Sequence, residues 1–127
     1  MHVEVIRGVV VSGRGGASRA MVGERLRDRS EVAGEILVPG TLNVLLVEGT
    51  AAALEALGDP LLSTEHNARV GPLRWWPVSV SVGGLSGVEA WIVRHERTVT
   101  RYLEIVSAVG FRAAGVCDGA VVEITPR

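Results

Sequence analysis

A glycine-rich segment near the start of the chain has the composition of a phosphate-binding loop. Ser12-Gly13-Arg14-Gly15-Gly16-Ala17-Ser18 follows a run of β-branched residues. Closely spaced glycines let backbone N–H groups converge on phosphate oxygens without a Cβ in the way. Arg14 and Arg19 stand on either side of Gly15 and Gly16, and each offers several N–H donors to a phosphate. The segment therefore predicts a triphosphate site, with an ordinary glycine turn as the alternative interpretation.

Two uncharged oxygen donors stand two positions apart further along the chain. Thr41 and Asn43 belong to an apolar stretch, residues 41–47, that is typical of a buried strand. Because strand side chains alternate between faces, these two point to one side and Leu42 to the other. A hydroxyl and an amide carbonyl suffice for Mg²⁺ when phosphate oxygens and waters complete its shell. The alternative is that Thr41 begins a turn and Asn43 satisfies a backbone group.

Glu104 is a carboxylate in an otherwise apolar stretch, Leu103 to Val106. An unpaired charge among apolar neighbours is costly. We therefore expect Glu104 to have either a ligand or an arginine partner, for which Arg101 and Arg112 are the candidates.

The elements that must position these residues are mostly short strands. Apolar alternation and turn residues predict strands over residues 2–11, 35–38, 41–47, 74–82, 88–93, 102–106 and 121–125. Helices are predicted over 18–29 and 50–57, an irregular connector over 61–67 and a helical turn over 111–114. Adjacent Trp75 and Trp76 must face opposite sides of their strand, so burial in the core is the expected role. Six or more strands with few helices indicate a mainly-β barrel, and the absence of a linker or repeat indicates a single domain over residues 1–127.

Composition excludes several classes of function. The net charge is −1, which disfavours nucleic acid as a partner. All thirteen basic residues are arginine, which excludes a P-loop lysine and Schiff-base chemistry. The apolar stretches are too short to cross a membrane, and the N-terminus lacks the pattern of a secretory signal. The lone Cys117 cannot form an intramolecular disulfide and is expected to be buried, so we predict a soluble cytoplasmic protein.

Three separated stretches resemble the CTP-dependent riboflavin kinases, in that family's own order. The first, residues 8–17, is similar to an opening strand and nucleotide loop of the form G-x-V-x-S-G-x-G-x-G. The second, Pro39-Gly40-Thr41-Leu42-Asn43-Val44, resembles the G-T-L-N signature. The third runs from Leu103 to Ala108 and continues through Phe111-Arg112 and Asp118-Gly119, similar to the L-E-I-I-A-P, L-R and D-G-D elements.

The resemblance implies a small six-stranded cradle-loop (RIFT-like) β-barrel with a few short helices. It also implies transfer of the γ-phosphate of CTP to the 5′-hydroxyl of riboflavin, with Mg²⁺ as the cofactor. The nucleotide would be bound by Gly13, Arg14, Gly15, Gly16, Ala17, Ser18 and Arg112. Thr41 and Asn43 would hold the metal, Asn43 and Glu104 would be catalytic, and Thr98 and Glu104 would contact the flavin. The expected partners are these two small molecules, with no nucleic acid or membrane, and the chain is expected to be a monomer or weak homodimer.

The chain departs from the family pattern at three positions. Ala17 stands at the third loop glycine, and Gly16 replaces the acidic residue that usually precedes it. Glu96 lies eight residues before Glu104, where the family has threonine, and a two-residue deletion would bring Thr98 into that place. These departures favour an alternative function, a non-catalytic sensor of nucleotide or flavin. A third interpretation, a DNA-binding barrel, is disfavoured by the net charge.

Overall fold

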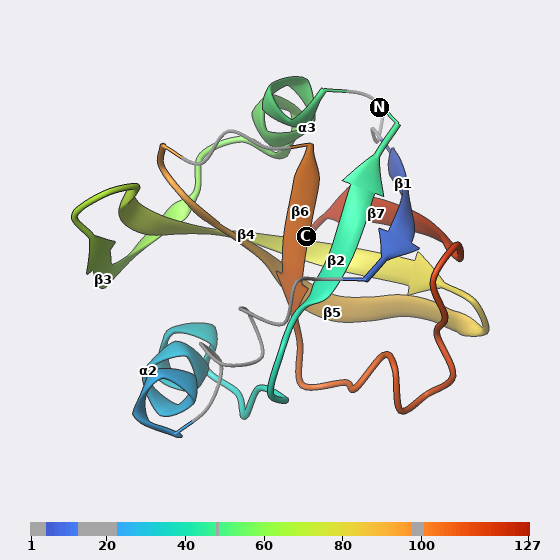
Figure 1. The fold of residues 1–127 in the computed structure, drawn as a ribbon, viewed down its shortest axis with the longest axis horizontal. Coiled ribbons are helices and arrows are strands. Elements are labelled where there is room, and N and C mark those ends of the chain that lie inside the picture. The colour runs from blue at the N-terminus through green and yellow to red at the C-terminus, as the bar shows by residue number, and fades with distance from the viewer. Residues whose placement is uncertain (1–4, 13–22, 48, 98–100) are drawn as a thin grey trace.

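Seven strands and two helices make up the part of the chain that the structure, a computed structural model, describes: residues 5–12, 23–47, 49–97 and 101–127. The strands are β1 (Ile6–Val11), β2 (Leu42–Leu46), β3 (Leu61–Asn67), β4 (Gly71–Val82), β5 (Leu85–His95), β6 (Tyr102–Val106) and β7 (Val121–Pro126). The helices are α2 (Gly23–Ala33) and α3 (Thr50–Leu57). Figure 1 shows the strands crossing at the centre, with α2 and α3 on opposite sides of them.

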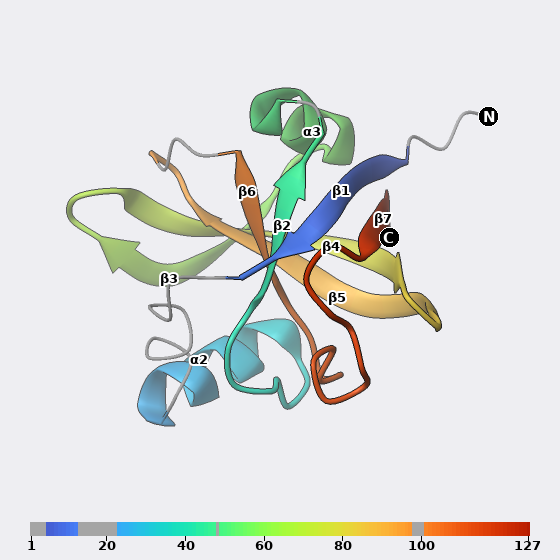
Figure 2. The same ribbon diagram turned by 45° about the vertical axis from the view of Figure 1, so that its right-hand side comes forward.

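Six of the strands close into an antiparallel barrel. Their order is β4-β5-β6-β2-β1-β7, and β7 pairs back onto β4. The closure occurs at β7, where Ile124 pairs with Ile6 on β1 and with Val80 on β4. The seventh strand, β3, pairs with β4 and carries the sheet outward beyond the barrel (Figure 2). The predicted mainly-β barrel with a few short helices is therefore confirmed.

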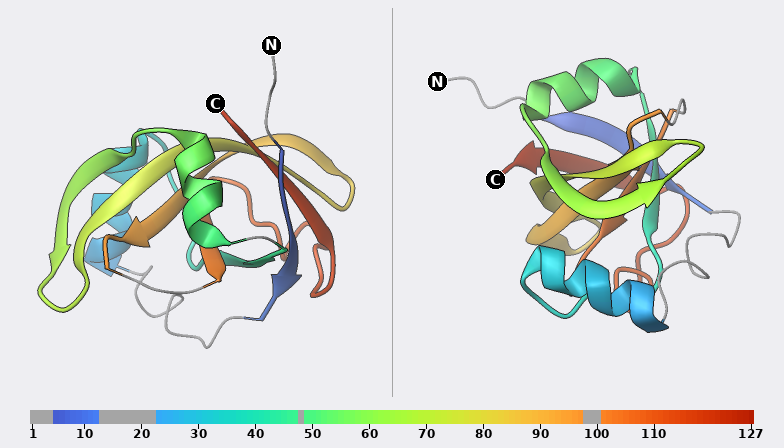
Figure 3. Two further views of the ribbon diagram at one scale, coloured as in Figure 1. Left: turned by 90° about the horizontal axis from the view of Figure 1, so that it is seen from above. Right: turned by 90° about the vertical axis from the view of Figure 1, so that its left-hand side faces the viewer.

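The barrel interior is filled by alternate residues of its strands. On β4 these are Trp76, Val78, Val80 and Val82, all of which are buried. The indole N–H of Trp76 donates to the carbonyl of Gly58 at 3.0 Å and so ties the end of α3 to the barrel. The two views in Figure 3 show α3 lying along one end of the strands.

A second, smaller core lies on the outer face of the sheet. Trp75, Val93 and Val106 point away from the interior cluster and pack with residues contributed by α2 and by the segment that follows it. The helix ends at Ala33 and is followed by Gly34, whose φ of 72° suits glycine, and the chain then turns so that Leu37 is buried in this cluster. Trp75 and Trp76 thus face opposite sides, as predicted, and each serves a separate core.

Three local predictions were wrong. Residues 35–38 form no strand, because only Leu37 of this apolar run is buried and Ile36 is exposed. Residues 61–67 are strand β3 rather than a connector. Cys117 is exposed rather than buried, and its thiol donates to the carbonyl of Gly115.

The helix over 50–57 and the strand over 102–106 match the prediction, whereas the helix predicted over 18–29 is described from Gly23 and continues to Ala33. In the described part of the chain, the helices are too short or too polar to pass through a membrane.

Gly8 offers a test of how closely β1 and β2 approach. A Cβ added there would lie 2.6 Å from both the Leu45 carbonyl oxygen and Cγ1 of Val44, which is well inside van der Waals contact. We expect Gly8→Ala to lower the free energy of unfolding by about 1–3 kcal/mol, measured by urea denaturation, because the backbones must separate. Gly84→Ala is the matched control, since no atom crowds that position, and it should change stability by less than about 0.5 kcal/mol. Equal effects of the two substitutions would contradict the close approach.

Candidate functional site

Asn43 and Glu104 are directly opposite one another on neighbouring strands. Asn43 on β2 pairs with Glu104 on β6, and Glu104 in turn pairs with Val93 on β5. Paired residues in an antiparallel ladder share a face of the sheet. Because Val93 belongs to the outer cluster, Asn43 and Glu104 also project from the outer face, the one that α2 covers.

The other side of Asn43 is occupied by the end of β1. Val11, the last residue of that strand, pairs with Asn43, and Ser12 follows it directly. Thr41 lies two residues before Asn43, directly before the first residue of β2. Its Oγ1 is buried and has no hydrogen-bond partner among the described residues. A buried hydroxyl without a partner is energetically unfavourable, so the Thr41 oxygen is suited to accept a ligand.

The surroundings of Glu104 raise the pKa of its carboxyl. Its side chain is exposed, yet neighbouring atoms displace enough water to raise the pKa of the carboxyl above its ordinary value. The positive charges of Arg29, His95 and Arg94 oppose this rise in pKa but do not cancel it. The nearby charges are therefore not those expected from the sequence, because neither Arg101 nor Arg112 acts on this carboxyl.

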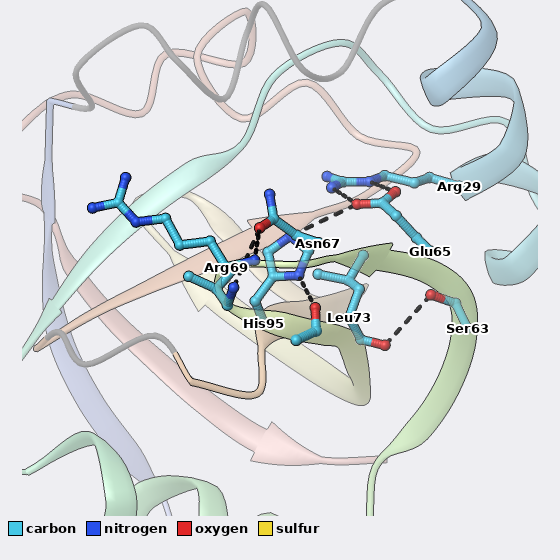
Figure 4. Close-up of polar contacts among 9 residues, drawn as sticks. Arg29, Ser63, Glu65, Asn67, Arg69, Leu73 and His95 are labelled. Atoms are coloured by element: carbon cyan, nitrogen blue, oxygen red, sulfur yellow. Dashed lines mark hydrogen bonds and ion pairs between the residues drawn. The ribbon is translucent and has the colours of Figure 1, made fainter.

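Arg29 and Glu65 form a bidentate ion pair next to Glu104. Nε of Arg29 donates to Oε1 of Glu65 at 2.9 Å, and Nη2 donates to Oε2 at 2.6 Å. Only 7% of the Arg29 side chain is exposed, so this is a largely buried charge held by a partner of fitting geometry. Nε2 of His95 lies 3.8 Å from the same carboxylate, while its Nδ1 lies 3.0 Å from the carbonyl of Gly71 (Figure 4). Helix α2 and strands β3 and β5 thus converge on one polar cluster.

The ion pair also lines an open groove between α2 and β3. The groove has a volume of about 580 Å³. Its walls carry charges of both signs and two hydroxyls, from Glu24, Arg25, Asp28, Arg29, Val32, Ser63, Thr64 and Glu65. Such a lining suits a polar molecule with many hydrogen-bonding groups better than an apolar one.

Arg112 lies at the end of β1, apart from Glu104. Its Nη2 donates to Oδ1 of Asp118 at 2.5 Å and to the carbonyl of Val11 at 3.4 Å. The second carboxylate oxygen of Asp118 accepts a hydrogen bond from the hydroxyl of Ser12. The hydrogen bond from Ser12, followed by the hydrogen bond and the charge of Arg112, holds the pKa of Asp118 below its usual range. The described part of the site thus has an arginine beside the residue where the predicted phosphate loop begins.

Several predicted site residues lie outside the described part of the chain. These are the loop residues Gly13, Arg14, Gly15, Gly16, Ala17 and Ser18, together with Thr98. Of the remainder, the structure pairs Asn43 with Glu104 on one face of the sheet, and Thr41 lies directly before β2. Arg112 contacts the end of β1 through the carbonyl of Val11.

Sequence reasoning missed Arg29, Glu65 and His95. Glu65 was hidden because residues 61–67 resembled a connector. Arg29 did leave a signal, since it lies three residues after Leu26 and four before Ala33, both of which pack into the outer cluster. A charged residue within the buried stripe of a helix requires a partner, and that requirement points to a carboxylate elsewhere in the chain.

The donor atoms at Thr41 and Asn43 match one kind of cation. Among the described residues, no three His, Cys, Asp or Glu side chains are grouped in a way that could hold a metal. The orphaned hydroxyl of Thr41 and the amide oxygen of Asn43 are instead neutral, hard oxygen donors, the type that suits Mg²⁺ already carried by phosphates. The residues present therefore fit a magnesium–nucleotide complex better than a free metal ion.

Comparison with known proteins gives no family assignment. No model of a protein family matches the chain, and a search of curated proteins finds no significantly similar sequence.

Glu65→Gln tests the buried ion pair. At pH 7 we expect this variant to lose about 3 kcal/mol of unfolding free energy, because it removes the carboxylate that forms the bidentate pair with the buried guanidinium of Arg29. Burial raises the pKa of Glu65, but the hydrogen bond and charge of Arg29 lower it further, so the net folded pKa lies below the ordinary value of 4.5. The stabilisation is therefore present above about pH 4.5 and is lost as the pH falls through the folded pKa.

The difference between wild type and Glu65→Gln should consequently shrink between pH 6 and pH 3 in urea denaturation. Glu123→Gln is the control, because Glu123 pairs with Arg7 at an exposed site and should contribute less than about 0.5 kcal/mol. A difference that stays constant over this pH range would contradict the role given to the Glu65 carboxylate.

Proposed function

We propose that the protein is a cytoplasmic CTP-dependent riboflavin kinase, which transfers the γ-phosphate of CTP to the 5′-hydroxyl of riboflavin. The observation that carries the proposal is the register of β1, β2 and β6. Val11, Asn43 and Glu104 stand side by side in this ladder, so the three stretches that resemble the kinase family converge on one face of the barrel. This convergence supports the proposal, because stretches far apart in the sequence must meet if they are to form one site.

The nucleotide side of the proposed site combines the end of β1 with Arg112. The glycine-rich segment begins at Ser12, and Arg112 donates a hydrogen bond to the carbonyl of the preceding residue, Val11. Backbone N–H groups and a guanidinium together suit a triphosphate. Thr41 and Asn43 would hold Mg²⁺, which when bound neutralises charge on the phosphates.

The acceptor side of the proposed site centres on Glu104. In the reaction, the 5′-oxygen of riboflavin forms a bond to the γ-phosphorus, the bond to the β–γ bridging oxygen breaks, and CDP leaves with that electron pair. Glu104 would accept a hydrogen bond from the ribityl chain and orient it, since positioning dominates phosphoryl transfer. The raised pKa of Glu104 also makes it a candidate to receive the hydroxyl proton. The polar groove beyond Arg29 has the hydroxyl and charge lining that suits a polyol.

The direct test is incubation of the full chain with riboflavin, Mg²⁺ and each of the four nucleoside triphosphates, with FMN measured by chromatography. With CTP as the donor, we expect FMN and CDP to form in equal amounts. Absence of FMN with every nucleotide would overturn the kinase proposal. If nucleotide or flavin raises the melting temperature of the protein but no FMN forms, the result would instead support the non-catalytic sensor, which the departures at Gly16 and Ala17 favour.

Asn43→Ala tests the metal assignment within that assay. Loss of a metal ligand should lower kcat about a hundredfold, because the developing charge on the phosphates is then less well neutralised. The fold should be retained, as judged by circular dichroism, because Asn43 is only half-buried. Ser79→Ala, on strand β4 away from the site, is the control and should retain wild-type turnover. An undiminished rate in Asn43→Ala would contradict the assignment of Asn43 as a metal ligand.

Magnesium and nucleotide are expected to bind together. Two neutral oxygens hold Mg²⁺ weakly without phosphates, so titration calorimetry with MgCl₂ alone should give no measurable heat of binding. With CTP present, Mg²⁺ should strengthen nucleotide binding by at least about tenfold. Tight Mg²⁺ binding to the chain without nucleotide would contradict the assignment of Thr41 and Asn43.

A further inference from the structure

Asp118 connects two parts of the site by using both of its carboxylate oxygens. Oδ1 accepts a hydrogen bond from Nη2 of Arg112 at 2.5 Å, and Oδ2 accepts one from the hydroxyl of Ser12. Arg112 is held at a second point, because its Nη1 donates to the carbonyl of Val116 at 3.3 Å. We call Ser12, Arg112 and Asp118 the Asp118 cluster.

The backbone beneath the Asp118 cluster is fixed to β1. The N–H of Gly119 donates to the carbonyl of Val10 at 2.7 Å, and the N–H of Val10 donates to the carbonyl of Ala120 at 2.9 Å. The turn that carries Arg112 is anchored by two buried side chains, Phe111 and Val116. An exposed ion pair usually loses side-chain entropy and contributes little, but here both partners start from backbone that is already ordered.

The charge of Asp118 needs an explanation if phosphate binds nearby. A free carboxylate would repel a triphosphate, and nothing in the packing requires one, since Asp118 is exposed. Its negative charge is instead shared between a guanidinium and a hydroxyl. A carboxylate in this arrangement weakens the local attraction for phosphate slightly but restricts where the guanidinium can point.

We propose that Asp118 is a positioning residue, which holds Arg112 at the end of β1 in the orientation that binds a nucleotide phosphate. The inference rests on the proposed function, because it assigns a task to Asp118 within the same site. Arginine carries five N–H donors, so Arg112 can retain its bond to Asp118 and still donate to a phosphate oxygen. Asp118 itself need not touch the nucleotide.

The test is a double-mutant cycle on the affinity for MgCTP, measured by titration calorimetry. Asp118→Ala should weaken binding about tenfold, and Arg112→Ala should weaken it by a similar or larger factor. If Asp118 acts through Arg112, the double variant Arg112→Ala/Asp118→Ala should bind no more weakly than Arg112→Ala alone. Additive losses in the double variant would overturn the inference.

Two further variants separate positioning from a merely structural role. In Asp118→Asn the amide oxygen can still accept a hydrogen bond from Arg112, and the amide NH₂ can donate one to the Ser12 hydroxyl. The affinity of this variant for MgCTP should therefore be within about threefold of the wild-type affinity. Asp59→Ala, at an exposed aspartate after α3, is the matched control and should leave the affinity unchanged. A lower melting temperature for Asp118→Ala with an unchanged Kd would show a structural role only and would overturn the inference.

The outcome for the wild-type chain distinguishes this inference from the proposed function. If wild type binds MgCTP and Asp118→Ala binds it equally well, the positioning role is wrong and the kinase proposal stands. If wild type binds no nucleotide and forms no FMN, the kinase proposal is wrong, and the role of Asp118 falls with it.

Discussion

The antiparallel register of β1, β2 and β6 is the constraint on which the candidate site depends. Side chains of a strand alternate between faces, so a slip of one residue in β2 would turn Asn43 into the barrel interior and Val44 out of it. Burial of Val44, which has no exposed surface, makes such a slip costly. Apolar side chains that never touch a ligand therefore determine which polar side chains reach the outer face.

The site also depends on a second core that the barrel alone would not provide. Helix α2 packs on the outer face over Trp75 and Val93, and this packing carries Arg29 down to the sheet. Once buried, the guanidinium needs a carboxylate, which the outlying strand β3 supplies through Glu65. Burial raises the pKa of Glu104, and Arg29 and His95 of this cluster oppose that rise, although neither belongs to the stretches that resemble the kinase family.

Sequence reasoning predicted the barrel and the strands that close it, because those strands have one buried face and show it as regular alternation. It failed at β3, whose residues are mostly exposed on both faces, so that no hydrophobic period marks it. It failed again at residues 35–38, where three successive apolar residues suggested a strand but only Leu37 finds a core. The pairing of Asn43 with Glu104 was beyond prediction, since register follows from the packing of the whole barrel rather than from either strand.

Closure of the barrel joins segments that are far apart along the chain. Ile6 and Ile124 pair directly, and β7 must meet both β1 and β4 before either has all its neighbours. Forming contacts of such large sequence separation costs the conformational entropy of the intervening chain before the contacts stabilise the fold, and proteins with many such contacts typically fold slowly. Until β7 docks, β1 and β4 keep unpaired backbone edges that invite association with other chains, so refolding yield should fall as protein concentration rises.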